Sequence, residues 1–121
     1  MNYNLLIHVD LDEPRLLNLA FDNANNYLKL LHENQQPLEA EVVLLANGPA
    51  VKMFEKTEEN AEFEKRGLDL MASGLSIRLC VNALKKFGVE HDRLWDGCKV
   101  ISGGVIEIVK LQNDGFSYLK P

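Results

Sequence analysis

The feature that most constrains this chain is a regular succession of short apolar runs and longer segments with helical periodicity. The apolar runs have the length of β-strands and fall at residues 4–9, 39–46, 76–80, 99–101 and 116–120. Since a helical segment separates each run from the next, the pattern predicts a parallel or mostly parallel sheet with helices on both faces. We expect the 121 residues to form a single α/β domain over residues 1–121.

The helical segments carry recognisable starts and stops. Pro14 opens the first segment, and its apolar residues recur at spacings of three and four: Leu17, Ala20, Phe21, Ala24, Tyr27, Leu28 and Leu31. Further helices are expected at residues 50–54, from residues 57–60 to Gly74, at residues 81–87 before Gly88, and from Val105 to Asp114-Gly115. Gly67 interrupts the second of these, because glycine disfavours a helix interior.

The charge balance argues against two classes of partner. Lys plus Arg number 13 and Asp plus Glu number 18, which gives a net charge of −5 and a pI of about 5.1. Without a basic cluster, the chain lacks the positive surface that nucleic-acid phosphates or an anionic membrane attract. Its apolar runs are also far shorter than the about 20 residues of a membrane-spanning helix. No leader-like segment opens the sequence, so we expect a cytoplasmic protein with reduced cysteines.

In open α/β sheets, ligands bind beyond the carboxyl ends of the strands, where loops converge and helix N-termini point inward. The candidate site residues follow successive strands: His8, Asp10, Asn47, Gly48, Cys80, Ser102, Gly103 and Gly104. The two glycine-containing turns in this set are able to offer backbone N–H groups to an anion. The same segments are somewhat more typical of tight strand-to-helix turns without a ligand.

Cys80 closes the third predicted strand and directly precedes a helix. N–H groups of a first helical turn and the positive end of the helix dipole both favour a thiolate there. Such a thiolate is able to attack or carry a sulfur atom, with His8 and Arg78 as neighbours that assist it. The competing interpretation is a buried, unreactive cysteine, with Arg78 in a solvent or subunit ion pair and His8 as a structural side chain.

The second cysteine, Cys98, lies at the start of the fourth predicted strand, at the opposite end from Cys80. The depth of a parallel sheet would separate the two, so we expect no disulfide between them. His8, His32 and His91 lack the close spacing to cysteine that a structural zinc site needs. We therefore predict no metal, and no motif points to a cofactor.

Several segments, taken together and in order, resemble the DsrE/DsrF-like family. They are HVDLDEPRLLNLAFDNANNYL, VVLLANGPAVK, the C-x-N-x-L that begins at Cys80, KVISGGVIEIVKLQNDG and the closing FSYLKP. The resemblance covers nearly the whole chain. It implies a three-layer α/β/α sandwich with a mainly parallel five-stranded sheet, and a homo-oligomer that is commonly a trimer or a hexamer.

The resemblance also implies a role for one cysteine. In better understood members, a cysteine accepts persulfide sulfur and passes it along a relay used in sulfur oxidation or tRNA thiolation. That cysteine corresponds to Cys80, and nothing comparable is implied for Cys98. Sulfur donor and acceptor proteins are the partners that such a relay requires, although this sequence looks closer to the small stand-alone members than to the subunits of heteromeric complexes.

Two functions remain open at the level of sequence. In the first, the chain is a cytoplasmic sulfur carrier or sulfurtransferase-like protein, in which Cys80 holds a persulfide while backbone amides and Asn82 steady its charge. In the second, it is a non-enzymatic oligomeric module that binds a small anionic ligand in the same cleft, with Cys80 in the wall. The extent of thiolate formation at Cys80 near neutral pH separates them.

Apolar side chains support an oligomer independently of the resemblance. The last predicted helix carries more of them than contact with one sheet face requires: Ile106, Ile108, Val109 and Leu111. The short final strand adds Phe116, Tyr118 and Leu119 at an expected sheet edge, where a single domain favours charge. We expect these residues to be buried between subunits, close to the Cys80 cleft.

Overall fold

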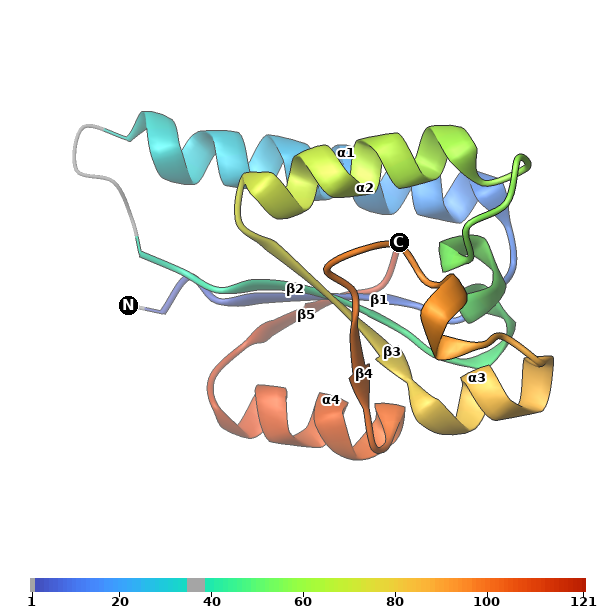
Figure 1. Ribbon diagram of the computed structural model, residues 1–121. Helices are drawn as coiled ribbons and strands as arrows, with labels where there is room; N and C mark the ends of the chain where they lie inside the picture. Colours follow the sequence, from blue (N-terminus) through green and yellow to red (C-terminus); the bar gives the residue numbers. More distant parts are fainter. Residues whose placement is uncertain (1, 35–38) are drawn as a thin grey trace.

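Five parallel strands form the centre of the structure, a computed structural model that describes residues 2–34 and 39–121 (Figure 1). The strands are β1 (Leu5–Val9), β2 (Val42–Ala46), β3 (Leu75–Cys80), β4 (Lys99–Ile101) and β5 (Ser117–Leu119). They lie in the order β4-β3-β2-β1-β5, and every neighbouring pair is parallel. The prediction of an α/β fold with a mainly parallel five-stranded sheet is confirmed, and the sheet is parallel throughout.

Helices cover both faces of this sheet. They are α1 (Pro14–Glu33), α2 (Ala61–Ala72), α3 (Val81–Phe87) and α4 (Gly104–Asn113), with the 3₁₀ helices η1 (Gly48–Phe54) and η2 (His91–Arg93). Figure 1 shows α1 and α2 above the sheet, and α4 and α3 below it. The sheet therefore lies between two helical layers, as an α/β/α sandwich requires.

The layer of α1 and α2 covers most of the apolar core, because α1 presents one continuous apolar face. Its buried residues recur at spacings of three and four: Leu17, Ala20, Phe21, Ala24, Leu28 and Leu31. They share a core with strand residues Ile7, Leu44 and Ile77, all fully buried. Pro14 stands in the first turn of α1, where the N–H that proline lacks would have no partner within the helix.

Gly67 in α2 has a packing reason. A Cβ at this position would lie 2.6 Å from Cζ3 of Trp95, which is closer than side-chain contacts allow. Trp95 is 1 % exposed and also packs on Phe54, with ring centroids 4.8 Å apart. The glycine that interrupts the helical pattern therefore lets α2 approach the indole ring.

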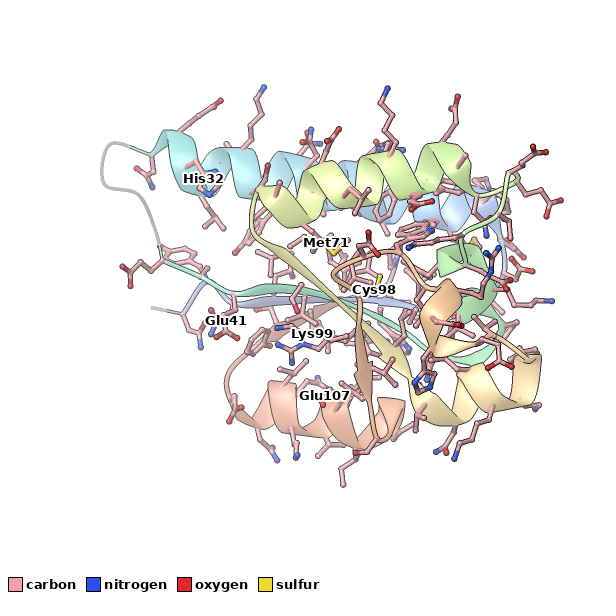
Figure 2. The ribbon with its side chains drawn as sticks, viewed as in Figure 1. His32, Glu41, Met71, Cys98, Lys99 and Glu107 are labelled. Carbon is pink, nitrogen blue, oxygen red and sulfur yellow. The ribbon has the colours of Figure 1, made fainter. Side chains whose placement is uncertain are left out.

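The face of the sheet that α4 covers has a smaller apolar cluster. It also carries two polar strand side chains, His8 and Arg78. In this cluster, Leu111 of α4 and Phe116 pack against three strand residues, Leu6, Val43 and Leu45. Since strand side chains alternate between faces, His8 shares this side with Leu6. Arg78 of β3 contacts Glu107 of α4, with a nitrogen-to-oxygen distance of 3.2 Å and both side chains 19 % exposed (Figure 2). This ion pair joins α4 to β3, the strand next to the edge strand β4.

Several parts of the fold differ from the expected elements. The helix expected at residues 50–54 is the 3₁₀ helix η1, which begins at Gly48, and the helix expected from residues 57–60 begins at Ala61. The predicted second strand begins at residue 39, whereas β2 begins at Val42, because its neighbour β1 begins at Leu5 and the two residues pair. Between Gly88 and Lys99 the structure adds η2 and an antiparallel bridge from Glu55 to Leu94, which no periodic pattern indicated. Across residues 2–34 and 39–121, no helix combines the length and apolar character needed to cross a membrane.

Candidate functional site

Cys80 is the last residue of β3, and its sulfur is contacted by a different helix from the one expected. The backbone N–H of Gly104 donates a hydrogen bond to Sγ over 3.3 Å. Gly104 is the first residue of α4, whereas the sequence pointed to the start of α3. The reason is strand register: Cys80 pairs with Ile101 at the end of β4, so the chain that leaves β4 passes beside the sulfur.

Gly104 also brings Cys80 together with Asn47. A Cβ on Gly104 would lie 3.0 Å from Cβ of Asn47 and 3.4 Å from Cβ of Cys80. A larger residue would therefore push against both side chains. The ends of β2 and β3 and the start of α4 thus meet at one point, and a glycine is needed there for close approach rather than for its backbone angles.

These residues line a groove with a volume of about 390 Å³. Its walls contain Asn47, Gly48, Pro49, Cys80, Asn82, Ala83, Lys86, Phe87, Gly103, Gly104, Val105 and Ile106. Six of the nine candidate residues from the sequence are therefore brought together, while His8, Asp10 and Ser102 are absent from the lining. Ser102 is exposed, one position before the turn enters the groove.

His8 lies behind the groove and reaches it through Asn47. Its Nε2 is 2.8 Å from Oδ1 of Asn47, and its Nδ1 is 2.5 Å from the hydroxyl of Tyr118. Both ring nitrogens are thus engaged, and the side chain is 8 % exposed. This arrangement does not match the expectation that His8 assists the thiol directly, because neither nitrogen is left to contact the sulfur.

Gly48 forms the turn that closes the groove beside β1. Its φ of +57° lies in the left-handed region, where residues with a Cβ are disfavoured. A Cβ there would also lie 3.0 Å from the carbonyl oxygen of Asp10. The Asn47-Gly48-Pro49 turn predicted from the sequence therefore has a steric requirement for glycine, with or without a ligand.

Among the residues that the structure describes, the groove lining has one charged side chain, Lys86 of α3. Its Nζ stands 5.6 Å from the centroid of the Phe87 ring, and Nζ of Lys52 stands at the same distance from that ring. Sequence reasoning missed Lys86 and Phe87. The signal was present, because Lys86 follows Asn82 by four residues, and that spacing puts both on one face of a helix.

Arg78 forms a mostly buried ion pair inside the chain, whereas the more ordinary of its two predicted roles was a solvent or subunit ion pair. Besides its ion pair with Glu107, its Nε donates to Oγ of Ser76 over 3.3 Å. The guanidinium is therefore engaged with α4 and with its own strand. Its contribution to the site is indirect, through the position of α4.

Cys98 lies in a different environment from Cys80. It precedes β4 and lies beneath α2, near Met71 (Figure 2). Burial raises the pKa of the Cys98 thiol to about 12, and the negative charges of Glu64 and Asp96 act in the same direction. Both cysteines are free thiols. Among the described residues, no three histidine, cysteine or carboxylate side chains gather as metal ligands would.

Comparison with known proteins finds relatives over nearly the full length. The DsrE/DsrF-like family matches residues 8–121. A solved protein of unknown function from Methanobacterium thermoautotrophicum, MTH1491, is 25 % identical, with a TM-score of 0.84 over 99 % of this chain and 100 % of its own. The ychN protein from E. coli is 18 % identical, with a TM-score of 0.67 over 98 % of this chain and 99 % of its own. No curated protein matches the chain.

Proposed function

The chain belongs to the DsrE/DsrF-like family, and on that premise we propose that it is a sulfur carrier that holds a persulfide on Cys80. The observation that carries this proposal is the hydrogen bond from the Gly104 N–H to Sγ. An N–H donor at the first residue of a helix stabilises negative charge on the sulfur it contacts. A thiolate and a terminal persulfide are both anions of this kind.

The chemistry consists of two exchanges of S–S bonds. The Cys80 thiolate attacks the outer sulfur of a donor hydropersulfide, RSSH. A bond forms between Sγ and that sulfur while the S–S bond of the donor breaks, so the donor leaves as RS⁻ and Cys80 becomes a hydropersulfide. An acceptor thiolate then attacks the same outer sulfur and releases the Cys80 thiolate. Each step replaces one S–S bond with another, so no external oxidant or reductant is needed.

Burial restricts how partners reach the sulfur. Cys80 is 6 % exposed and lies in the wall of the groove. A donor or acceptor must therefore bring its sulfur into the groove as a small molecule or on a projecting segment of a protein. We propose the cytoplasm as the compartment, since a reducing environment keeps the two thiols available.

A second candidate function is supported by the charge of the groove. The chain has a net charge of −5, yet the one charged side chain that the described part of the chain places in the groove lining is the cation Lys86. Together with the Gly104 amide, it favours an anion. A non-enzymatic module that binds a small anionic ligand would use the same groove, with Cys80 only as part of its wall.

Intact mass spectrometry tests the carrier. Wild type, Cys80→Ser and Cys98→Ser are each incubated with polysulfide, thiosulfate or a persulfidated donor protein. We expect a gain of one or more sulfur atoms in wild type and Cys98→Ser, and none in Cys80→Ser. Sulfur uptake that persists in Cys80→Ser, or is absent from all three proteins, would contradict the proposal.

Anion titration tests the alternative. If the chain is only a binding module, Cys80→Ser binds sulfate or thiosulfate as tightly as wild type, and Lys86→Gln binds either more weakly. Chemical-shift changes of the Gly104 amide report the binding. If the chain is a carrier, Cys80→Ser takes up no sulfur, whether or not the variant still binds anions.

A further inference from the structure

Tyr118 belongs to the closing segment of the chain, and its hydroxyl is used inside the fold. β5 is an edge strand beside β1, and its register pairs Tyr118 with Leu6. From that position the hydroxyl reaches Nδ1 of His8, and Nε2 of His8 reaches Oδ1 of Asn47. A continuous line of hydrogen bonds therefore runs from the edge of the sheet to the groove.

The chemistry of the groups determines the direction of both bonds. Oδ1 of Asn47 carries no hydrogen, so it accepts, and Nε2 of His8 is the nitrogen that carries the proton. In a neutral ring, Nδ1 is then an acceptor, and the Tyr118 hydroxyl donates to it. Tyr118 thereby selects the tautomer of His8 that is able to donate to Asn47.

The bond from His8 also determines which side of the Asn47 amide faces the groove. With Oδ1 held by His8, Nδ2 is turned towards Gly104 and would lie 3.2 Å from a Cβ on that residue. Gly104 is the residue whose N–H binds Sγ of Cys80. If the amide were reversed, its carbonyl oxygen would face the anionic sulfur and repel it.

We propose that Tyr118 and His8 are positioning residues that hold the N–H side of the Asn47 amide towards the sulfur on Cys80. Asn47 then supplies a second donor beside the Gly104 N–H, for a thiolate or for a persulfide. This inference deepens the proposed function and rests on it, since the species stabilised is the sulfur anion of the carrier. It gives the closing tyrosine a role in a site whose lining does not include it.

Alkylation of Cys80 by iodoacetamide at pH 7, in a Cys98→Ser background, tests the positioning without any sulfur donor. We expect Asn47→Ala to slow alkylation by about threefold or more, because the second donor that we propose for the sulfur anion is removed. His8→Leu slows it by the same factor, and the double variant slows it no further, because His8 acts through Asn47. His8→Gln keeps an N–H donor and recovers part of the rate.

The control is His32→Leu, which changes an exposed histidine near the end of α1 (Figure 2) and leaves the rate unchanged. A second readout is the ¹⁵N spectrum of the His8 ring in the folded protein. We expect the Nε2–H tautomer in wild type and a loss of that preference in Tyr118→Phe, together with slower alkylation. This measurement keeps the inference testable if His8→Leu does not fold.

Three results would overturn the positioning role. The first is an alkylation rate in folded His8→Leu that equals the rate of wild type, and the second is additive slowing when His8→Leu and Asn47→Ala are combined. The third is the Nδ1–H tautomer of His8 in wild type. Failure of the carrier function gives a different result. If Cys80 takes sulfur from no donor while the alkylation pattern holds, then persulfide carrying is wrong and the positioning of Asn47 stands.

Discussion

The N–H of Gly104 points at Sγ of Cys80 over 3.3 Å, and this contact joins the first residue of α4 to the last residue of β3. It exists because β3 and β4 are parallel neighbours that end together, with Cys80 beside Ile101. The Arg78–Glu107 ion pair holds the same two elements together further along α4. The environment of the sulfur therefore depends on how α4 sits against β3.

The two cysteines should differ in reactivity. We expect iodoacetamide to alkylate Cys80 faster than Cys98 near neutral pH, although Cys80 is the more buried residue. Cys98, with its pKa raised to about 12, contains almost no thiolate at pH 7, and only the thiolate reacts. Peptide mass spectrometry after timed alkylation gives both rates. Equal rates, or faster alkylation of Cys98, would falsify this prediction.

Gly104→Ala should disturb the site more than the fold. Its Cβ would press on Asn47 and Cys80, so we expect Cys80 alkylation at pH 7 to slow by about threefold or more. Alanine also restricts the unfolded chain more than glycine does, which stabilises the fold by about 0.4–1 kcal/mol and offsets part of the crowding in the free energy of unfolding. Gly103→Ala is the matched control, because its Cβ would meet only a methyl group of Ile106 at 3.2 Å. The same loss of rate in both variants would contradict this explanation.

Gly67→Ala should destabilise the protein. The new Cβ would overlap the indole of Trp95, and overpacking a core costs roughly 1–3 kcal/mol in the free energy of unfolding. Urea denaturation followed by circular dichroism measures the change. In the Gly67→Ala background, Trp95→Phe should cost less stability than it does in wild type, because the smaller ring relieves the overlap. Strictly additive effects would show that the two residues do not clash.

Cys98 should make stability fall at alkaline pH. The unfolded thiol has a pKa of about 8.5, and the folded pKa is about 12, so the unfolded chain loses its proton first as the pH rises. The contribution of the Cys98 thiol to the free energy of unfolding is fully present below about pH 8.5 and is lost progressively towards pH 12. We expect the free energy of unfolding to fall less between pH 8 and pH 10.5 in Cys98→Ala than in wild type or in Cys80→Ser. Identical slopes in all three proteins would refute the buried thiol as the cause.

The exposed face of α4 should be an interface between copies of this chain. Val105, Ile106 and Val109 are 70 %, 59 % and 51 % exposed, although all three are apolar. We expect a homotrimer or a hexamer by sedimentation equilibrium at micromolar concentration, and dissociation in Val109→Glu. Leu30→Glu is the control, because Leu30 is 67 % exposed but lies on α1. A wild-type mass of one chain at every concentration would remove this interface.

The order of strands and helices was readable from the sequence, because it depends on local signals. Apolar runs, a proline at Pro14 and a glycine at Gly88 act within a few residues, and they mark the elements that the structure contains. The position of Cys80 at the end of a strand followed from the same signals. Gly67 was the exception, because the reason for this glycine is the indole of Trp95, 28 positions along the chain, that packs against it.

The neighbours of the sulfur were decided by tertiary structure alone. All five residues of β2 are buried, so their apolar pattern does not distinguish one face of the strand from the other. No strand order can be deduced from such a pattern. The order β4-β3-β2-β1-β5 brings Gly104 to Cys80, and Tyr118 through His8 to Asn47. The sequence by itself determined that a cysteine ends a buried strand of a parallel sheet. The packing of distant strands determined which donors surround it, because hydrophobic periodicity encodes burial and not the identity of the neighbouring strand.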